Sequence, residues 1–440
     1  MPSWYGSCWL KWIPSLAAPV ERGGGCTLAR QCFAQALAAL NPQPLLRTRL
    51  DAAPRSLTQD AVIALGKAAG SMLTAWLEAP PGPVSSVLLV RPHGAPGLPL
   101  DVLARWDKHL YVIVAAHPEP DASSLEAGAA ALAAAHWCAA EPGQRRLVAL
   151  ISGGGSALME VPLAGDLERL RWLNRQLVAS GAGIGDINCI RKHRSAIKGG
   201  RLAAAAGAAA QQTWILSDVP PGAWSDVASG PTCPDATTQA DFEAVWRRWL
   251  PGEPERYPET PKPGDAAFAC AHWHCLADNR DACEALAAAA RAAGRDPVVV
   301  DHAADELDEP AAADYLLGRW RKLRAAHPRA ALVAGGEVRV HLQEGHGRGG
   351  RNQNLALRLA LALEGSTNCF LSAGTDGVDG SSAAAGACVD GQTAARIRAA
   401  GLDPADHLGR QDAHPALAAA GALVRTGPTG NNLRDLRLFL

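Results

Sequence analysis

Residues 147–158, LVALISGGGSAL, consist of an apolar run, a serine, three consecutive glycines and the start of a helix-like run. The apolar run is typical of a strand that is buried on both faces of a parallel sheet. Glycines let a ligand approach the backbone N–H groups, and serine hydroxyls add hydrogen-bond donors. We therefore interpret this loop as an anion-binding segment, against the alternative of a tight structural turn. Its residues are Ser152, Gly153, Gly154, Gly155 and Ser156.

Similar apolar runs alternate with alanine-rich helical patterns along the rest of the chain. The strand-like runs lie at 62–65, 87–90, 110–114, 147–151, 213–216, 298–300, 331–333 and 369–371. The helix-like patterns lie at 67–77, 122–138, 167–180, 199–210, 281–293, 312–326 and 354–363. This alternation predicts an α/β protein with two domains, each a mainly parallel or mixed sheet flanked by helices, the first of them Rossmann-like.

A proline-rich stretch, Pro251–Gly264, is the best candidate for a linker between the two domains. We therefore expect a first α/β domain over 27–265 and a second over 266–440. Residues 1–26 contain three tryptophans but no sustained apolar segment. They are expected to form a disordered extension instead of a secretory signal.

The composition excludes several classes of partner. Lys plus Arg (42) nearly balances Asp plus Glu (43), so no global field points to nucleic acid or to an acidic membrane. The apolar runs fall short of the roughly 20 residues that a membrane span requires. The 11 cysteines include no C-x-x-C pair, which indicates reduced thiols and a cytoplasmic location. The segment CAHWHC, residues 270–275, matches no zinc pattern and is interpreted as ordinary strand positions instead of a metal site.

A second glycine-rich loop, GHGRGGRNQN at 345–354, follows the strand-like run Val338–Leu342 and precedes a helix-like run at 355–363. Arg348 and Arg351 add fixed positive charge, which suits phosphate or carboxylate oxygens. The glycines also fit the dinucleotide pattern G-x-G-x-x-G. That pattern normally opens the first βαβ unit of its domain and is followed by an acidic residue about 20 positions on. We interpret the match as coincidence, although it keeps a dinucleotide-dependent enzyme as an alternative.

Single charged residues stand beside the predicted loops. Lys67 follows the run at 62–65, and a bound anion would offset the cost of a cation at a helix N-terminus. Asp218 follows the run at 213–216, where a carboxylate acts as a base or metal ligand, or as a plain turn residue. Asp376, in TDGVDG, is either a single magnesium ligand or a turn residue.

The segment IRKHRSAIKGGR, residues 190–201, concentrates positive charge. If it is helical, Arg191, Arg194 and Lys198 share one face at i, i+3 and i+7. That face would line an anionic cleft, and the alternative is a solvated surface.

Together these motifs resemble one family, the class II glycerate kinases. The matching stretches are LGKAAG, HPEPD, LISGGGSAL, INCIRKHRSAIKGGRLA, ILSDVP, SGPTCPD, ETPKPGD, GGE, GRGGRNQ, GTDGVDG and TGPTGNNLRDLR. They occur in the family's order and cover nearly everything from about 60 to 437. No P-loop motif is present in the sequence.

The resemblance implies a glycerate-kinase domain followed by a MOFRL domain, with an active site in the cleft between them. It implies transfer of a phosphoryl group from ATP, with Mg²⁺, to the 2-hydroxyl of D-glycerate by a monomer or homodimer. Lys67 resembles the family's lysine at the phosphoryl donor, Asp218 its candidate base and Arg351 its phosphate- or carboxylate-binding arginine. Glu337 and Asn432 resemble further contacts to the substrate or phosphate.

Two other functions stay open at this point. Members of this family have carried the name hydroxypyruvate reductase, and glycerate and hydroxypyruvate differ by one hydride at the same carbon. A non-catalytic sensor of a small anion is the second alternative. Clustered charges such as Lys67 and Asp218 at strand ends favour catalysis over sensing.

Overall fold

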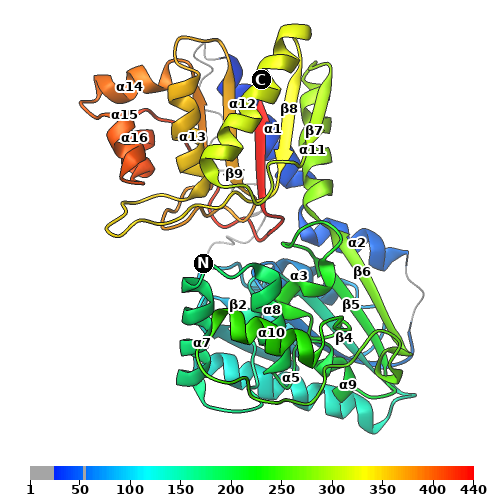
Figure 1. The fold of residues 1–440 in the computed structure, drawn as a ribbon. Coiled ribbons are helices and arrows are strands. Elements are labelled where there is room, and N and C mark those ends of the chain that lie inside the picture. Colours follow the sequence, from blue (N-terminus) through cyan, green and yellow to red (C-terminus); the bar gives the residue numbers. More distant parts are fainter. Residues whose placement is uncertain (1–23, 53–55) are drawn as a thin grey trace, which may run out of the picture. The chain divides into compact units, whose positions relative to one another are not determined.

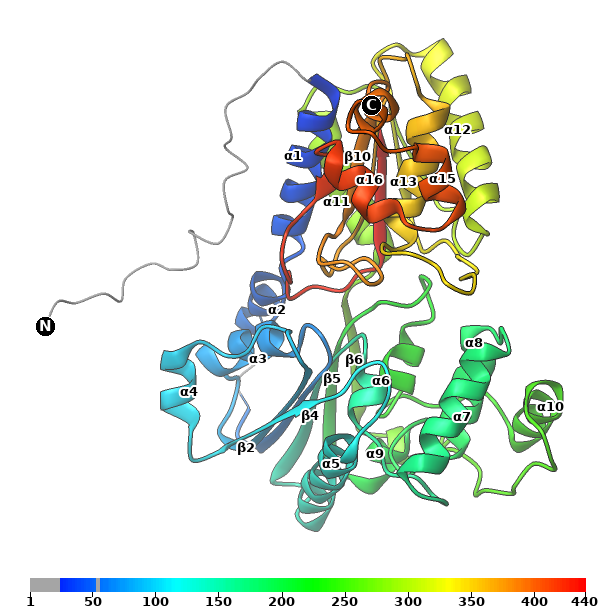
Figure 2. The same cartoon turned by 90° about the vertical axis from the view of Figure 1, so that its left-hand side faces the viewer.

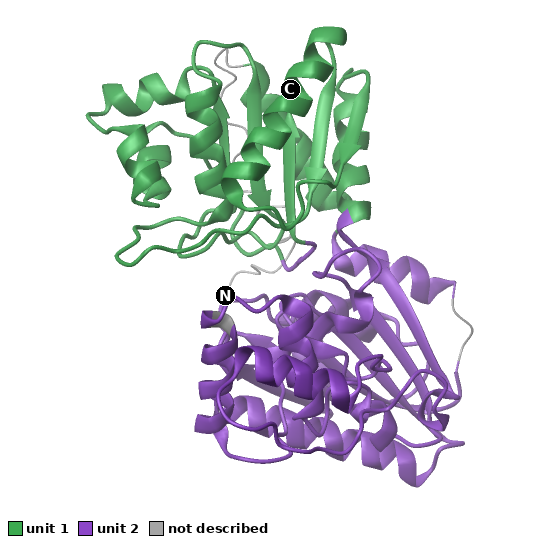
Figure 3. Cartoon of the chain, in the orientation of Figure 1, with its two compact units in different colours: residues 1–40, 280–429, 434–440 green, residues 41–279, 430–433 purple. Residues whose placement is uncertain are grey.

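The computed structural model describes residues 24–52 and 56–440. The chain divides into two compact units, shown in different colours in Figure 3. Unit 1 contains residues up to 40, 280–429 and 434–440, and unit 2 contains residues 41–279 and 430–433.

Unit 2 is built around a sheet of six strands in the order β3-β2-β1-β4-β5-β6 (Figure 1). The strands are β1 (Gln59–Leu65), β2 (Val84–Pro92), β3 (Leu110–Ala115), β4 (Arg145–Ser152), β5 (Ala210–Leu216) and β6 (Ala271–Ala277). Every neighbouring pair is parallel. The strand order changes direction between β1 and β4. In open α/β sheets, ligands bind at such a point, beyond the carboxyl ends of the strands.

Helices cover both faces of this sheet because its central strands are apolar on both sides. In β1, Ala61, Ile63 and Leu65 pack in one core cluster with the buried alanines of α5 (Ala122–Ala140). Helix α3 (Ala69–Glu78) also contacts β1, β2 and β4. The other helical segments of unit 2 are α2 (Pro42–Asp51), α4 (Leu100–Trp106), α6 (Gly155–Leu158), α7 (Leu167–Ala179), α8 (Ile184–His193), α9 (Arg201–Ala205), α10 (Gln239–Trp249) and the 3₁₀ turns Trp224–Ser229 and Ala266–Phe268.

Unit 1 has a mixed sheet in the order β11-β10-β9-β12-β8-β7. Its strands are β7 (Val298–Asp301), β8 (Ala331–Gly335), β9 (Cys369–Gly374), β10 (Gly386–Asp390), β11 (Leu423–Val424) and β12 (Asp435–Phe439). Only β7 and β8 pair in parallel, and the other pairs in this sheet are antiparallel. Strand β12 lies between β9 and β8 and is buried along its whole length.

The helices of unit 1 lie on both faces of its sheet (Figures 1 and 2). On one face, α12 (Glu309–Ala326) and α13 (Arg351–Ala362) form a core with alternate residues of the strands, including stacking of Trp320 on Phe439. Helix α1 (Gly24–Ala39) contacts β9, β10 and β12. The remaining helices are α11 (Asn279–Ala292), α14 (Thr393–Ala399), α15 (Pro404–Gly409) and α16 (Ala413–Ala419). No helix in the described parts of the chain has both the length and the apolar character needed to cross a bilayer.

The eight predicted strands are all present, and both units have the predicted α/β architecture. Three local predictions are wrong. Residues 338–342 form no strand apart from a single bridge between Arg339 and Asp308. The expected helix at 199–210 shrinks to α9, because residue 210 already pairs with Arg146 of β4. Residues 24–26 belong to α1, whereas the rest of the expected N-terminal extension lies outside the described residues.

The division into units also differs from the expected boundary at 265. The proline-rich stretch Pro251–Gly264 lies inside unit 2, because β6 follows it and pairs with β5. The chain passes into unit 1 only after Asn279, and helix α1 packs with the later part of the chain.

We expect Gly128→Ala to destabilise unit 2, although alanine normally stabilises a helix relative to glycine. A Cβ atom at this position of α5 would lie 2.2 Å from the backbone oxygen of Glu160, which cannot move aside as a flexible side chain can. The free energy of unfolding, measured with denaturant, should fall by about 1–3 kcal/mol.

Gly318→Ala in α12 is the matched control, because a Cβ atom there meets nothing within 4 Å. It should raise the free energy of unfolding by about 0.5–1 kcal/mol. Equal effects of the two substitutions would contradict the packing argument.

Candidate functional site

The carboxyl ends of β1 and β4 are tied together by their loops. The backbone N–H of Lys67 donates to the Gly153 oxygen at 3.0 Å. The N–H of Ala68 donates to Oγ of Ser152 at 3.0 Å, and that hydroxyl donates to the Leu65 oxygen at 3.2 Å. The loop after the first strand and the glycine loop after the fourth therefore form one surface at the point where the strand order changes direction.

Gly153 brings Asp218 and Asn432 to this surface. The amide Nδ2 of Asn432 donates to Oδ2 of Asp218 at 3.0 Å. A Cβ atom on residue 153 would lie 1.8 Å from that Oδ2 and 2.1 Å from that Nδ2. Glycine is therefore required here by close approach, and both predicted polar residues lie against its backbone.

Gly154 has φ of +86°, in the left-handed region that favours glycine. A Cβ atom there would lie 3.4 Å from the imidazole ring of His117 and 3.5 Å from Cγ of Lys67. His117 is therefore a further member of the candidate site that was not among the predicted residues. Its signal in the sequence is weak: it begins the stretch HPEPD just after β3, at the same edge of the sheet.

The far end of the glycine loop is connected to α8. Oγ of Ser156 is 2.8 Å from Oγ of Ser229, and that serine donates to Oδ1 of Asn188 at 3.0 Å. The oxygen of Ser229 also accepts from the N–H of Gly199. The predicted basic segment 190–201 therefore adjoins the loop, but through serine and asparagine contacts.

The basic residues of this segment do not share one helical face. Helix α8 ends at His193, so Lys198 lies beyond it, and the expected i, i+7 alignment is wrong. Lys198 is buried in an ion pair with Glu160, and burial lowers its pKa against the opposing effect of that carboxylate. Arg191 donates to Oδ1 of Asn174 at 3.2 Å and lines a small pocket beside α7.

In unit 1, Arg351 begins α13 and is held between two carboxylates. Its Nε and Nη2 donate to both oxygens of Asp435, at 2.6 and 3.2 Å, and Nη2 is 2.7 Å from Oε1 of Glu337. Burial alone would raise the pKa of Asp435, but Arg351 outweighs it and lowers this pKa. Arg351, with 36% of its side chain exposed, is therefore fixed in place as a permanent positive charge.

Asp379 satisfies the first backbone donors of α13. Its carboxylate accepts from the N–H of Asn352 at 3.0 Å and from the N–H of Gln353 at 2.9 Å. Burial raises the pKa of Asp379 to about 6, with a contribution from nearby Asp435, although the backbone donors oppose the shift. The carboxylate thus occupies the helix N-terminus that the sequence had suggested for a bound anion.

The glycines at 345–350 do not have the geometry of a dinucleotide loop. Nine residues separate the end of β8 from Gly345. A Cβ atom at Gly347 would meet the Asp412 side chain at 2.3 Å, and one at Gly350 would meet Asp379 at 2.4 Å. These glycines therefore serve close packing against acidic side chains, in agreement with the interpretation of the pattern as coincidence.

Asp376 lies in the turn after β9. Its Oδ1 accepts from the N–H of Val378 at 3.1 Å, as a turn residue does. A Cβ atom on Gly374 would lie 3.1 Å from that oxygen and 3.4 Å from Oδ1 of Asp435. Across the described residues, the one group of three or more potential metal ligands consists of cysteines and does not include Asp376. The segment CAHWHC contributes strand β6 and no such group.

Comparisons with known proteins agree with this architecture. Residues 28–255 match the family model described as a domain of unknown function, DUF4147, and residues 330–435 match the MOFRL family. A putative hydroxypyruvate reductase of Agrobacterium vitis is 38% identical, with 93% of each chain covered. A D-glycerate 2-kinase of Thermotoga maritima is 35% identical over 86% of this chain and 90% of that protein.

The fold is shared as well. The crystal structure of a glycerate kinase from Thermotoga maritima has a TM-score of 0.80 at 32% identity and covers 94% of this chain and 99% of its own. The two α/β units, with a glycine loop, a lysine and an aspartate at one edge of the unit 2 sheet, are those of a glycerate-kinase-like protein. The chain belongs to the glycerate kinase family that combines DUF4147 and MOFRL domains.

We expect Asp379→Asn to flatten the pH dependence of stability between about pH 4 and 6. A carboxyl whose folded pKa is about 6, above its ordinary value of 3.8, favours the folded state most when protonated. Its contribution is therefore complete below pH 3.8 and is lost as the pH rises through 6. The loss is at most about 3 kcal/mol, from roughly two pKa units at 1.36 kcal/mol each.

The readout is the difference in unfolding free energy between pH 4 and pH 7 for the wild type and the variant. Asparagine has one acceptor oxygen fewer than aspartate, so the substitution also changes stability at every pH. Only the difference between the two pH values therefore tests the assignment. Parallel pH profiles for the two proteins would contradict the assignment.

Proposed function

We propose that this protein transfers the γ-phosphoryl group of ATP to the 2-hydroxyl of D-glycerate and releases 2-phosphoglycerate. The observation that carries the proposal is the convergence of Lys67, the glycine loop and the Asp218–Asn432 pair at one sheet edge. Relatives named as glycerate 2-kinases, aligned over most of the chain, favour the same reaction. We propose a distinct role for each of these residues.

Lys67 and the glycine loop would bind phosphate oxygens of the nucleotide. The Lys67 side chain passes beside Gly154, where the backbone carries no side chain to keep a ligand away. A fixed positive charge next to the loop stabilises the negative charge on the transferred group. Phosphoryl transfer needs little covalent chemistry from the protein, so positioning and charge are sufficient roles.

Asp218 would position the glycerate hydroxyl and take its proton. The bond from Asn432 engages one carboxylate oxygen and fixes the plane of the carboxylate before the substrate binds. Such fixed orientation of a reacting group is a main source of rate enhancement. His117, on the other side of Gly154, adds a polar ring next to the same loop.

The remaining residues divide into binding and supporting roles. Arg351, which is fixed by Asp435 and Glu337, would bind a phosphate or the glycerate carboxylate. Lys198 and Arg191 would support the segment that contacts Ser229, because Lys198 is already neutralised by Glu160. We assign these two a positioning role.

The residues fit a magnesium ion that arrives with the nucleotide. Mg²⁺ commonly binds through one or two carboxylates together with substrate phosphates and water. Asp376, in the turn after β9, is the carboxylate we propose for this contact. When bound, the ion neutralises phosphate charge during transfer.

The direct test is a coupled assay of purified protein with D-glycerate, ATP and magnesium that distinguishes 2-phosphoglycerate from 3-phosphoglycerate. We expect the 2-phospho product. A protein that oxidises NADH or NADPH with hydroxypyruvate and releases no ADP would be the reductase instead. Tight binding of glycerate with neither turnover would indicate the sensor.

Lys67→Ala should lower kcat/KM by about 100-fold or more, because the charge next to the transferred group is lost. Lys108→Ala is the matched control, an exposed lysine of the same unit, and should retain wild-type activity. Circular dichroism and the unfolding midpoint should be unchanged in both. An active Lys67→Ala enzyme would remove the lysine from the mechanism.

Asp218→Asn should lower kcat by about 10²–10⁴-fold, the range expected for loss of a general base. Asparagine keeps the size of the side chain beside Gly153, so the KM for glycerate should change much less than kcat. The comparison variant Asn432→Ala keeps the Asp218 carboxylate but removes its orienting hydrogen bond, and it should lower kcat by a smaller factor. An Asp218→Asn variant with unchanged kcat would exclude this carboxylate as the base.

A further inference from the structure

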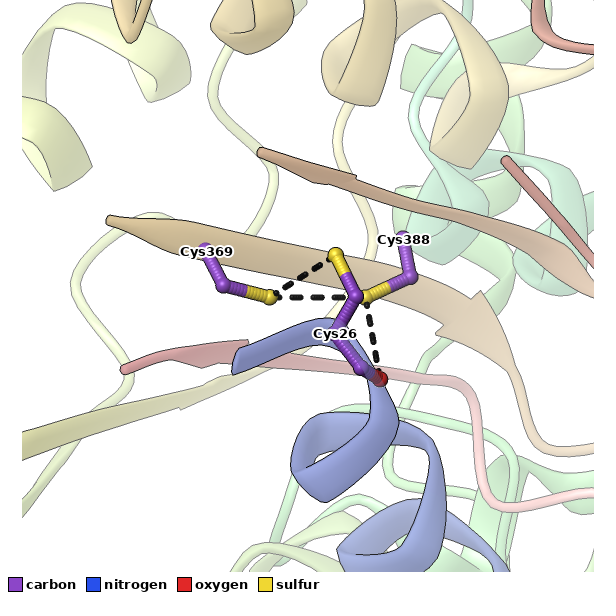
Figure 4. Close-up of side chains that lie close together, drawn as sticks. All are labelled: Cys26, Cys369 and Cys388. Atoms are coloured by element: carbon purple, nitrogen blue, oxygen red, sulfur yellow. Dashed lines mark hydrogen bonds between the residues drawn. The ribbon is translucent and has the colours of Figure 1, made fainter. Parts of the chain in front are cut away.

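Three cysteines from distant parts of the chain converge in unit 1, and we call them the sulfur cluster: Cys26, Cys369 and Cys388. Figure 4 shows their side chains directed toward one another. Sγ of Cys369 lies 3.2 Å from Sγ of Cys26 and 3.5 Å from Sγ of Cys388. All three sulfurs lie within 4.8 Å of one another. Nothing in the proposed phosphoryl transfer uses them.

The fold accounts for this convergence. Cys369 and Cys388 lie on neighbouring antiparallel strands, and the register pairs Cys388 with Leu371, two residues along from Cys369. Side chains two residues apart on a strand share a face, so both thiols lie on the face that α1 contacts. Cys26 lies in the first turn of α1.

Gly25 and Arg30 allow α1 to lie close to the strands. A Cβ atom on Gly25 would lie 2.8 Å from Cβ of Cys369, so glycine permits the approach of the helix start. One turn further, Arg30 donates to the backbone oxygens of Ala422 and Leu423, each at 2.8 Å. Arg30 therefore anchors this end of α1, and Gly25 leaves the room that Cys26 needs to lie over the two strands.

The distances suit a metal ion bound by three thiolates. In tetrahedral zinc sites the Zn–S bond is about 2.3 Å, which places ligand sulfurs about 3.8 Å apart. The observed separations of 3.2 and 3.5 Å require only small outward shifts. A disulfide needs an S–S distance of about 2.05 Å, and it would use two of the three sulfurs.

The donor type and the charge restrict the ion. Within the described residues no histidine or carboxylate joins the group, so the donors are soft and disfavour magnesium or calcium. Three thiolates carry a charge of −3, which a divalent ion and the nearby guanidinium of Arg30 would offset. The nearby carboxylate of Asp390 is itself paired with Arg396. The backbone oxygen of Cys26 lies 3.7 Å from Sγ of Cys388, within reach for a fourth ligand.

We propose that Cys26, Cys369 and Cys388 form a binding site for a thiophilic divalent ion of the zinc class, which fastens the first turn of α1 to β9 and β10. Each thiol that binds the ion releases its proton to solvent, and no electron transfer is involved. The site has a structural role that is independent of phosphoryl transfer.

The test uses the full-length protein, reduced and freed of metal with a chelator. Titration with Zn²⁺ by calorimetry, and with Cd²⁺ through the ultraviolet charge-transfer band of its thiolate bonds, should show one equivalent bound. Cys26→Ser should weaken this binding by about 100-fold or more, because an essential thiolate is lost. Serine is well tolerated at a helix start, so this variant should fold. Zn²⁺ should raise the Tm of the wild type and not that of the variant.

Cys270→Ser is the matched control, since this exposed cysteine lies outside the sulfur cluster, and it should bind the ion as the wild type does. Cys388→Ser serves as a second cluster variant if Cys26→Ser folds poorly. The proposal is overturned if the reduced wild type binds no metal saturably, or if both cluster variants bind it with wild-type affinity. It is also overturned if mass spectrometry of protein purified without reductant finds a Cys26–Cys369 disulfide and reduction restores no metal binding.

Discussion

Asp218 and Asn432 can share their hydrogen bond only because residue 153 has no side chain, since a Cβ atom there would overlap both polar groups. This contact holds residues 430–433 on unit 2, together with the bond from Nδ2 of Asn279 to the Leu433 oxygen at 2.7 Å. The loops after β1, β4 and β5 and the returning segment are thereby fixed relative to one another. A carboxylate oriented in advance does not have to be ordered during the reaction.

The candidate anion-binding residues of the two units are arranged in different ways. In unit 2 the glycine loop carries no side chains over its backbone, and the Lys67 side chain lies beside Gly154. In unit 1 the start of α13 is already occupied by Asp379, and the positive charge is an arginine held by two carboxylates. An arginine held in this way costs little further ordering when it binds a ligand. The glycines at 347 and 350 make room for acidic side chains and not for phosphate.

Much of the fold could be predicted because the strands of unit 2 are nearly continuous apolar runs. Strand β12 was missed because Asp435 and Arg437, both buried, interrupt its apolar pattern. Lys67 and Asp218 could be placed near one edge, since the carboxyl ends of parallel strands meet there. His117 also follows a strand end at this edge, but nothing else in the sequence singled it out. The partner of Lys198 could not be predicted, because that ion pair joins residues far apart in the chain.

The central position of β12 in the sheet of unit 1 has a consequence for biosynthesis. It is the last strand in chain order, yet β9 and β8 each pair with it and not with each other. During translation, residues 41–279 emerge early and contain the whole sheet of unit 2. The sheet of unit 1 stays divided, with apolar strand edges unpaired, until β12 leaves the ribosome. Nascent chains of this protein should therefore depend on chaperones chiefly through unit 1.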